Sequence, residues 1–161
     1  MPAETHEVRD GYPTTLQQEN RLQRETVVGK GVLLGFDQFL TTFVALPGAI
    51  DVSAVERALQ ILVDRHEVLR TTFRRVGDEF RQFVVASPKV RVSVREAPTH
   101  HHSVAALREA YARPFAPDTE MFLRPLLLRH AVDKATLVII IDHLVGDETA
   151  LQNLVTEFRE A

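Results

Sequence analysis

The residues best suited to chemistry lie just after an apolar run near the end of the chain. The run at 137–141 is followed by Asp142 and His143, and Asp147 stands four positions after the histidine. A histidine titrates near neutral pH, so it can accept a proton from an attacking group or hold a hydrogen bond to it. A position directly after a buried strand would hold the imidazole on a rigid element. The spacing therefore predicts a site for proton transfer at His143, with Asp147 as the N-cap of a following helix.

The other reactive side chains carry no comparable pattern. Three adjacent histidines at 100–102 cannot all face one metal ion, and no carboxylate or cysteine falls at a ligand spacing nearby. We expect them in a solvated loop before a helix capped by Ser103. Ser53, Thr71 and Thr72 lack the context of a nucleophile elbow, so a serine-type hydrolase has no support. The absence of cysteine excludes disulfides, thiolate metal sites and a cysteine nucleophile.

The composition is that of an ordinary globular protein and excludes several classes of function. Hydrophobic residues make up 45% and charged residues 25% of the 161 positions, which predicts one domain with a real hydrophobic core. A formal net charge of -3 with scattered arginines argues against nucleic acid as a partner. The start of the chain lacks the apolar stretch of a secretory signal, and the longest apolar run is too short to span a bilayer. We therefore expect a cytoplasmic protein with no membrane association.

Four helices are predicted from caps and from the spacing of apolar residues. Thr15 and Gln18 match a capping box at the start of the first helix, and Gly29 and Gly31 would close it. Apolar residues recur at helical spacing along the second and fourth helices. The helices are expected over 16–27, from Asp51 to 65, over 103–112, and from Asp147 to the end of the chain.

Strands rich in β-branched and aromatic residues are predicted between these helices. Turn pairs at 77–78 and 133–134 indicate two hairpins. The last strand is apolar enough to be a central strand covered on both faces. The strands are expected over 39–48, 69–76, 79–85, 90–96, 122–132 and 135–142. Hairpins instead of strict alternation favour an α+β sandwich in which helices pack against a mixed β-sheet.

Nine consecutive residues resemble a known motif. The stretch RHEVLRTTF at 65–73 matches without a mismatch the pattern RHExLRTxF, the second core motif of condensation domains of nonribosomal peptide synthetases. Residues 12–13 with Gln18 resemble the opening motif of that family, although Asn20 stands where an arginine is usual. Segments that resemble the region before the active-site strand follow in the same order at 113–115 and 123–128.

The third motif of the family, HHxxxDG, is written DHLVGDE in this chain. His143 matches the second histidine, which is catalytic in the family, and Asp147 matches the aspartate, with Gly146 just before it. Asp142 replaces the first histidine, and Glu148 replaces the glycine. The resemblance implies a chloramphenicol acetyltransferase-like sandwich, formed as a single N-terminal lobe over 13–161 after a flexible tail or linker at 1–12. The C-terminal lobe of a family domain has no counterpart here, so we expect a partner lobe or self-association.

The resemblance also implies a reaction, the formation of an amide bond between carrier-protein-bound acyl and aminoacyl thioesters in secondary-metabolite and antibiotic biosynthesis. His143 would either take a proton from the amine or hold a hydrogen bond to it, and both roles stay open. Asp147 would form an ion pair with Arg65 or Arg70 of the second motif and so tie the active-site loop to the neighbouring hairpin. The partners would be peptidyl or acyl carrier proteins, which bring their own phosphopantetheine arm, and no cofactor or metal would be bound directly.

Two departures from the motif keep a second class of function open. Glu148 puts a side chain where the family keeps bare backbone beside the substrate channel, or it simply joins an acidic first helical turn. With Asp142, it favours a catalytically degenerate condensation-like domain that acts as a protein-recruiting or structural module. His143 and Asp147 favour the enzyme, an acyltransferase-type condensation domain that is inactive as this isolated half. A third candidate is a stand-alone acyltransferase with the same HxxxD core.

Overall fold

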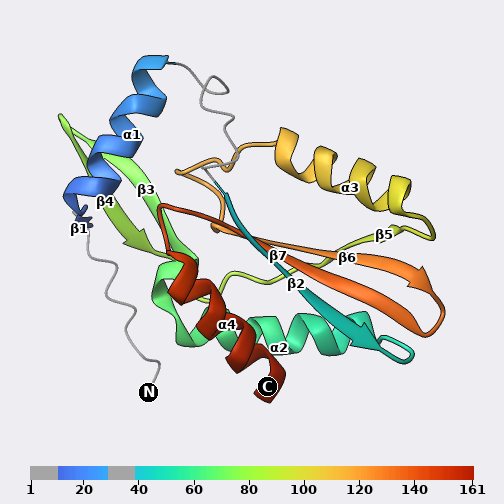
Figure 1. Cartoon of the computed structure of the whole chain (residues 1–161). Coiled ribbons are helices and arrows are strands. Elements are labelled where there is room, and N and C mark those ends of the chain that lie inside the picture. The colour runs from blue at the N-terminus through green and yellow to red at the C-terminus, as the bar shows by residue number, and fades with distance from the viewer. Residues whose placement is uncertain (1–10, 29–38) are drawn as a thin grey trace, which may run out of the picture.

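The computed structural model describes residues 11–28 and 39–161, which form two β-sheets and four α-helices (Figure 1). The larger sheet contains, in spatial order, β2 (Phe39–Pro47), β7 (Lys134–Asp142), β6 (Leu123–Ala131) and β5 (Ser93–Glu96). The smaller sheet contains β1 (Tyr12–Pro13), β4 (Glu79–Val84) and β3 (Thr71–Val76). The helices are α1 (Leu16–Val28), α2 (Val52–Arg65), α3 (His100–Ala112) and α4 (Glu148–Glu160), with a 3-10 turn η2 (Glu67–Arg70).

The central strand of the larger sheet is β7, as the sequence predicts. It pairs antiparallel with β2 and β6, so that Ile141 lies between Leu40 and Leu123, and its last six residues are buried. Helix α3 covers one face of this sheet, while α2 and α4 cover the other (Figure 1). Because both faces are covered, the strand needs apolar residues along nearly its whole length. The rigid end of β7 therefore delivers the residue after it, His143, to a defined place.

The smaller sheet carries α1. The carboxylate of Glu19 accepts the N–H of Phe80 at 3.3 Å and the hydroxyl of Thr14 at 2.8 Å. These contacts dock the start of α1 against β4, and the helix lies alongside the small sheet (Figure 1). The capping box at its first turn is confirmed, because Thr15 N–H donates to Gln18 Oε1 at 2.9 Å and Gln18 N–H donates to Thr15 Oγ1 at 3.2 Å. Closure of this helix at Gly29 and Gly31 lies outside the described residues.

The predicted first residues of one helix, α3, and one strand, β3, are wrong. Helix α3 begins at His100, because Thr99 serves as its N-cap and accepts the N–H of His102 at 3.5 Å. The three histidines therefore form the first turn of the helix instead of a loop, and Ser103 is not the cap. The strand predicted from Leu69 begins only at Thr71, because Leu69 and the residue after it belong to η2.

The strand predicted over 90–96 is shorter than expected. The N–H of Val90 donates to Gln60 Oε1 at 2.9 Å and that of Val92 donates to Glu56 Oε1 at 3.0 Å, so side chains of α2 take the bonds that a neighbouring strand would need. Only residues 93–96 pair with β6. Near the start of the described residues, Tyr12 already belongs to β1, one residue before the predicted boundary, and residues 1–10 lie outside the described part.

Candidate active site

His143 lies on a tight turn between the end of β7 and the start of α4, as predicted, and it is exposed. The N–H of Val145 donates to the backbone oxygen of Asp142 at 3.0 Å, and the N–H of Leu144 donates to Asp142 Oδ1 at 2.9 Å. Such a bond from an aspartate side chain to the backbone two residues on is typical of a tight turn. Leu144 and Val145 are both buried and anchor the turn in the core. The imidazole is thereby presented to solvent on a rigid support.

Helix α1 contacts this turn with two side chains. Gln18 Nε2 donates to the carbonyl oxygen of Leu144 at 2.9 Å, and Arg21 Nη2 lies 3.0 Å from Asp142 Oδ1. The Asp142 side chain is only 5% exposed, and its burial raises the pKa of the carboxyl group, while Arg21 and the N–H of Leu144 lower it in part. Sequence reasoning named Asp142 and Gln18 but missed Arg21, because nothing in the sequence indicates which arginine meets this carboxylate.

Gly146 allows the turn to pack closely on its neighbours. A Cβ atom added at this position would lie 3.1 Å from Ile141 Cδ1 and 3.3 Å from Ala150 Cβ. Both distances are tighter than ordinary van der Waals contact. The glycine therefore lets the chain pass between the end of β7 and the first turn of α4.

The predicted ion pair between Asp147 and an arginine of residues 65–73 is wrong. Asp147 is exposed and caps α4, with Oδ1 accepting the N–H of Ala150 at 2.8 Å. Arg65 Nη1 contacts Glu157 Oε2 at 2.6 Å, and Arg70 donates to the backbone oxygen of Val85 at 2.9 Å and contacts Glu67 at 3.2 Å. The physical reason is that the orphan N–H groups of the helix attract the carboxylate, while both arginines have nearer acceptors.

Glu148 is the first residue of α4 and is exposed. An acidic side chain is favourable in the first helical turn, where the helix dipole is positive. This position agrees with the interpretation that Glu148 joins the acidic first turn of the helix. Whether the side chain also narrows a substrate channel stays a prediction.

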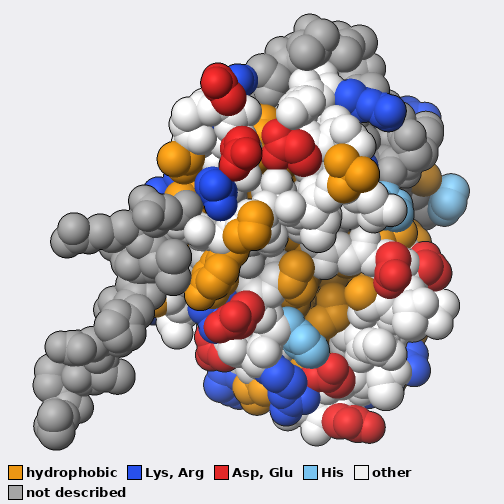
Figure 2. All heavy atoms as spheres, turned by 90° about the vertical axis from the view of Figure 1, so that its left-hand side faces the viewer, with side chains coloured by type: hydrophobic (Ala, Val, Ile, Leu, Met, Phe, Trp, Pro, Cys, Tyr) orange, Lys and Arg blue, Asp and Glu red, His pale blue; other side chains and the backbone are white. Residues whose placement is uncertain are grey.

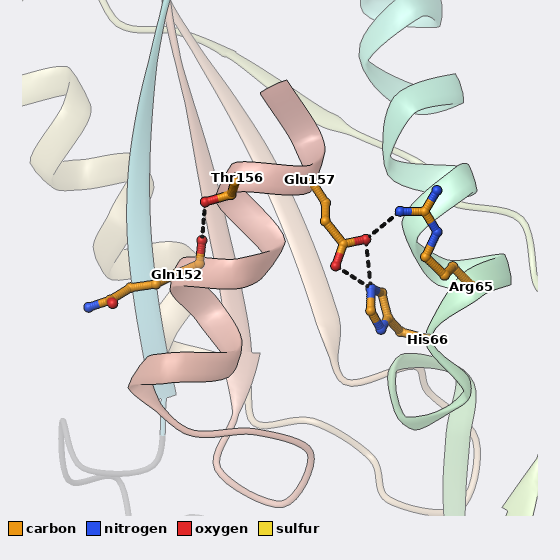
Figure 3. A network of polar contacts seen from close by, with 5 residues as sticks. All are labelled: Arg65, His66, Gln152, Thr156 and Glu157. Atoms are coloured by element: carbon orange, nitrogen blue, oxygen red, sulfur yellow. Dashed lines mark hydrogen bonds and ion pairs between the residues drawn. The ribbon is translucent and has the colours of Figure 1, made fainter. Parts of the chain in front are cut away.

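A polar cluster that the sequence did not predict joins α4 to the end of α2 (Figure 3). His66 Nε2 donates to the Glu157 carboxylate at 3.0 Å from each oxygen, and Arg65 contacts the same group from the end of α2. These hydrogen bonds, from His66 first and then Arg65, lower the pKa of Glu157. Figure 3 shows Glu157 reaching from α4 toward both residues, so the cluster ties the last helix to the segment after α2.

This cluster borders a pocket of about 170 Å³ between α4 and η2. The pocket is mostly apolar with a few polar groups on its wall, and it reaches the end of β7 and the turn after His143. Its lining residues are His66, Val68, Leu69, Ile141, Val145, Ala150, Asn153, Leu154 and Glu157. The face seen from the left side of Figure 1 carries hydrophobic side chains bordered by charged ones and a histidine (Figure 2).

The described part of the chain offers neither a metal site nor a membrane span. Within residues 11–28 and 39–161, no three or more histidine, cysteine or acidic residues come together in a way that could hold a metal ion. Over the same two ranges, no helix has the length and apolar character needed to cross a membrane.

The fold and the motifs define a class of protein. The family model for the condensation domain matches residues 12–161, and the chain belongs to that family, whose general function in nonribosomal peptide synthetases is peptide-bond formation. The prediction of an α+β sandwich of the chloramphenicol acetyltransferase-like kind is confirmed by the solved structures that it resembles. In sequence, the chain is 28% identical to tyrocidine synthase 2 of Brevibacillus parabrevis over 149 residues, which are 92% of this chain and 4% of that protein. It is 39% identical over 104 residues to phosphinothricin tripeptide synthetase PhsC of Streptomyces viridochromogenes, covering 61% of this chain and 10% of that protein.

Two solved structures illustrate the similarity in fold. The X-domain from teicoplanin biosynthesis superposes with a TM-score of 0.77 at 23% identity, covering 98% of this chain and 32% of that one. The starter condensation domain of rhizomide synthetase RzmA also gives a TM-score of 0.77, at 17% identity, covering 91% of this chain and 37% of that one. The chain thus spans about a third of these solved chains and a small fraction of the synthetases.

Proposed function

We propose that this chain is the N-terminal lobe of a condensation domain that joins a carrier-bound acyl or peptidyl thioester to the amine of a carrier-bound aminoacyl thioester, with His143 at the reaction centre. The observation that carries the proposal is the exposed imidazole of His143 on a buried, hydrogen-bonded turn at the end of the central strand. A rigid support of this kind is what a group that must meet a reacting atom requires. We also propose that the protein is located in the cytoplasm.

The proposed reaction needs one proton acceptor near the attacking nitrogen. The amine nitrogen forms a bond to the thioester carbonyl carbon, the carbon–sulfur bond breaks, and the thiolate takes up a proton. A neutral imidazole at His143 would accept the proton that the amine loses, or would hold a hydrogen bond to the amine while it attacks. The phosphopantetheine arm of each carrier protein would present the thioester and belongs to the substrate.

Asp147 and Gly146 support this site without touching the reacting atoms. The cap that Asp147 supplies keeps the first turn of α4 formed behind the histidine, and Gly146 lets that turn sit against Ile141. A well-formed first turn limits how far the histidine can move. In this proposal the residues that contact substrate other than His143 come from the second lobe.

The test adds a C-terminal lobe to the purified chain. The purified chain is mixed with the separately produced C-terminal lobe of the tyrocidine synthase 2 condensation domain and with loaded donor and acceptor carrier proteins, and the condensed product is measured by mass spectrometry. Product is expected with the parent chain and is expected to disappear with His143→Gln. His101→Gln, which changes an exposed histidine on α3, is the matched control and should leave the yield unchanged. Equal product from the parent and His143→Gln would refute the assignment.

A second candidate is the protein-recruiting module without catalysis. It is favoured by Asp142, which stands in place of the first histidine of the motif and is occupied by contacts within the lobe. A module of this kind would form no product in any combination with the second lobe. It would still bind a partner protein, and that binding would be insensitive to His143→Gln.

A further inference from the structure

The backbone on both sides of His143 is held by hydrogen bonds. On the N-terminal side, Asp142 pairs with Phe39 in the sheet. On the C-terminal side, the carbonyl of Leu144 accepts from Gln18, and the N–H of Val145 donates to the backbone oxygen of Asp142, so both ends of one peptide group are bonded. Because a peptide group is planar, these bonds restrict the dihedral angles around Leu144 and the direction in which the His143 side chain leaves the chain.

The Asp142 side chain is central to this arrangement, and Arg21 favours its charged form. Its Oδ1 atom receives both the N–H of Leu144 and the guanidinium of Arg21. A buried carboxylate without a cation is costly, so it tends to become protonated or to turn toward water. A charged acceptor holds the N–H of Leu144 more strongly than a neutral one. Loss of Arg21 should therefore weaken the turn as well as the ion pair.

Asp142 lies at one departure from the family motifs, and Arg21 lies next to another. An arginine is usual at the position of Asn20, and a histidine is usual at the position of Asp142. In this chain an arginine stands one residue later on α1, three positions after Gln18, so it projects from the same face of the helix as Gln18. It reaches the aspartate that replaces the histidine.

We propose that Arg21 and Asp142 form a positioning pair through which α1, together with Gln18, sets the orientation of His143. Neither residue is assigned a contact with substrate. The importance of the orientation for a reaction rests on the proposed function, but the orientation itself can be measured without any reaction.

Four variants of the full chain test the pair. Asp142→Asn keeps an acceptor for the N–H of Leu144 and removes the charge, and Arg21, whose side chain is 23% exposed, can then turn to water, so this variant is expected to fold. Arg21→Gln removes the cation, whereas Arg21→Lys keeps the charge. Arg24→Gln changes an exposed arginine one turn further along α1 and is the matched control.

The readouts are the amide exchange rates of Leu144 and Val145 and the side-chain coupling constants of His143 in the labelled, folded chain. In Arg21→Gln we expect exchange of both amides to rise about tenfold, which corresponds to a loss of about 1.4 kcal/mol in the free energy of opening this turn. We also expect the His143 side chain to change from one rotamer to an average over several. Asp142→Asn should show the same averaging, Arg21→Lys should recover part of the order, and Arg24→Gln should match the parent.

A His143 side chain that stays in one rotamer in both Arg21→Gln and Asp142→Asn overturns the proposal, whatever happens to the melting temperature. If Arg21→Gln does not fold, Asp142→Asn alone decides, since it leaves no buried unpaired carboxylate. The condensation assay separates this outcome from the proposed function. If product forms without His143, the proposed function fails, while the rotamer data still decide whether Arg21 and Asp142 position the side chain.

Discussion

Replacing Asp147 with alanine distinguishes the two roles that this carboxylate could have. In the structure it caps α4, and Oδ1 accepts the N–H of Ala150 at an exposed position. Loss of an N-cap typically costs about 1 kcal/mol, and loss of an acidic group near the helix N-terminus adds about 0.3–1 kcal/mol. We therefore expect Asp147→Ala to lower the free energy of unfolding by about 1–2 kcal/mol. Breaking a buried ion pair would instead cost about 3–5 kcal/mol.

The measurement is urea unfolding of the purified chain, followed by circular dichroism. A loss of about 1–2 kcal/mol should lower the melting temperature by about 2–8 °C for a domain of this size. Asp147→Ser and Asp147→Asn keep a capping oxygen and lose only the charge, so they should lower the free energy of unfolding by about 0.3–1 kcal/mol, less than Asp147→Ala. A loss above about 3 kcal/mol that the serine and asparagine variants share would mean that the charge has a buried partner, and the capping interpretation would be wrong.

Three further predictions can be tested on the same chain. Supplied alone with loaded carrier proteins, it should form no condensed product by mass spectrometry, because the proposed function requires a second lobe to supply the proximity effect, which can be worth about 7–11 kcal/mol. Product from the chain alone would contradict this. Gly146→Ala should lower the free energy of unfolding by about 1–2 kcal/mol, because the new Cβ would crowd Ile141 and Ala150. This overpacking outweighs the smaller conformational entropy that alanine has in the unfolded chain. Unchanged urea unfolding would show that the turn can relax. Burial raises the pKa of Asp142, so the carboxyl group holds its proton more tightly in the folded chain than in the unfolded chain. The contribution of this group to stability should therefore fall as pH rises from 3.8 through the raised value. The pKa of Glu157 is lowered instead, so the contribution of this group to stability should be lost as pH falls from 4.5 through the lowered value. In a series of urea unfolding measurements at different pH, Asp142→Asn should remove the first dependence and Glu157→Gln the second.

The fold class, most elements and the place of His143 could be predicted from the sequence, because these depend on signals that are local. The apolar run of β7 requires cover on both faces, and the capping box of Thr15 and Gln18 needs only residues within one helical turn. The turn that carries His143 follows from a strand that ends at Asp142 and a helix capped by Asp147. The nine-residue motif at 65–73 indicated the family without reference to any contact.

The pairing of charged groups, by contrast, depends on how the elements pack. Arg65 and Arg70 were the candidates for Asp147 on the basis of sequence, but a side chain binds the acceptor that packing brings nearest, and for Arg65 that is Glu157. Arg21 gave no signal of its own, since many arginines are scattered along the chain and the docking of α1 selects this one for Asp142. Long polar side chains reach several ångströms from the backbone, so their partners depend on the arrangement of the helices and sheets, and that information is not local in the sequence.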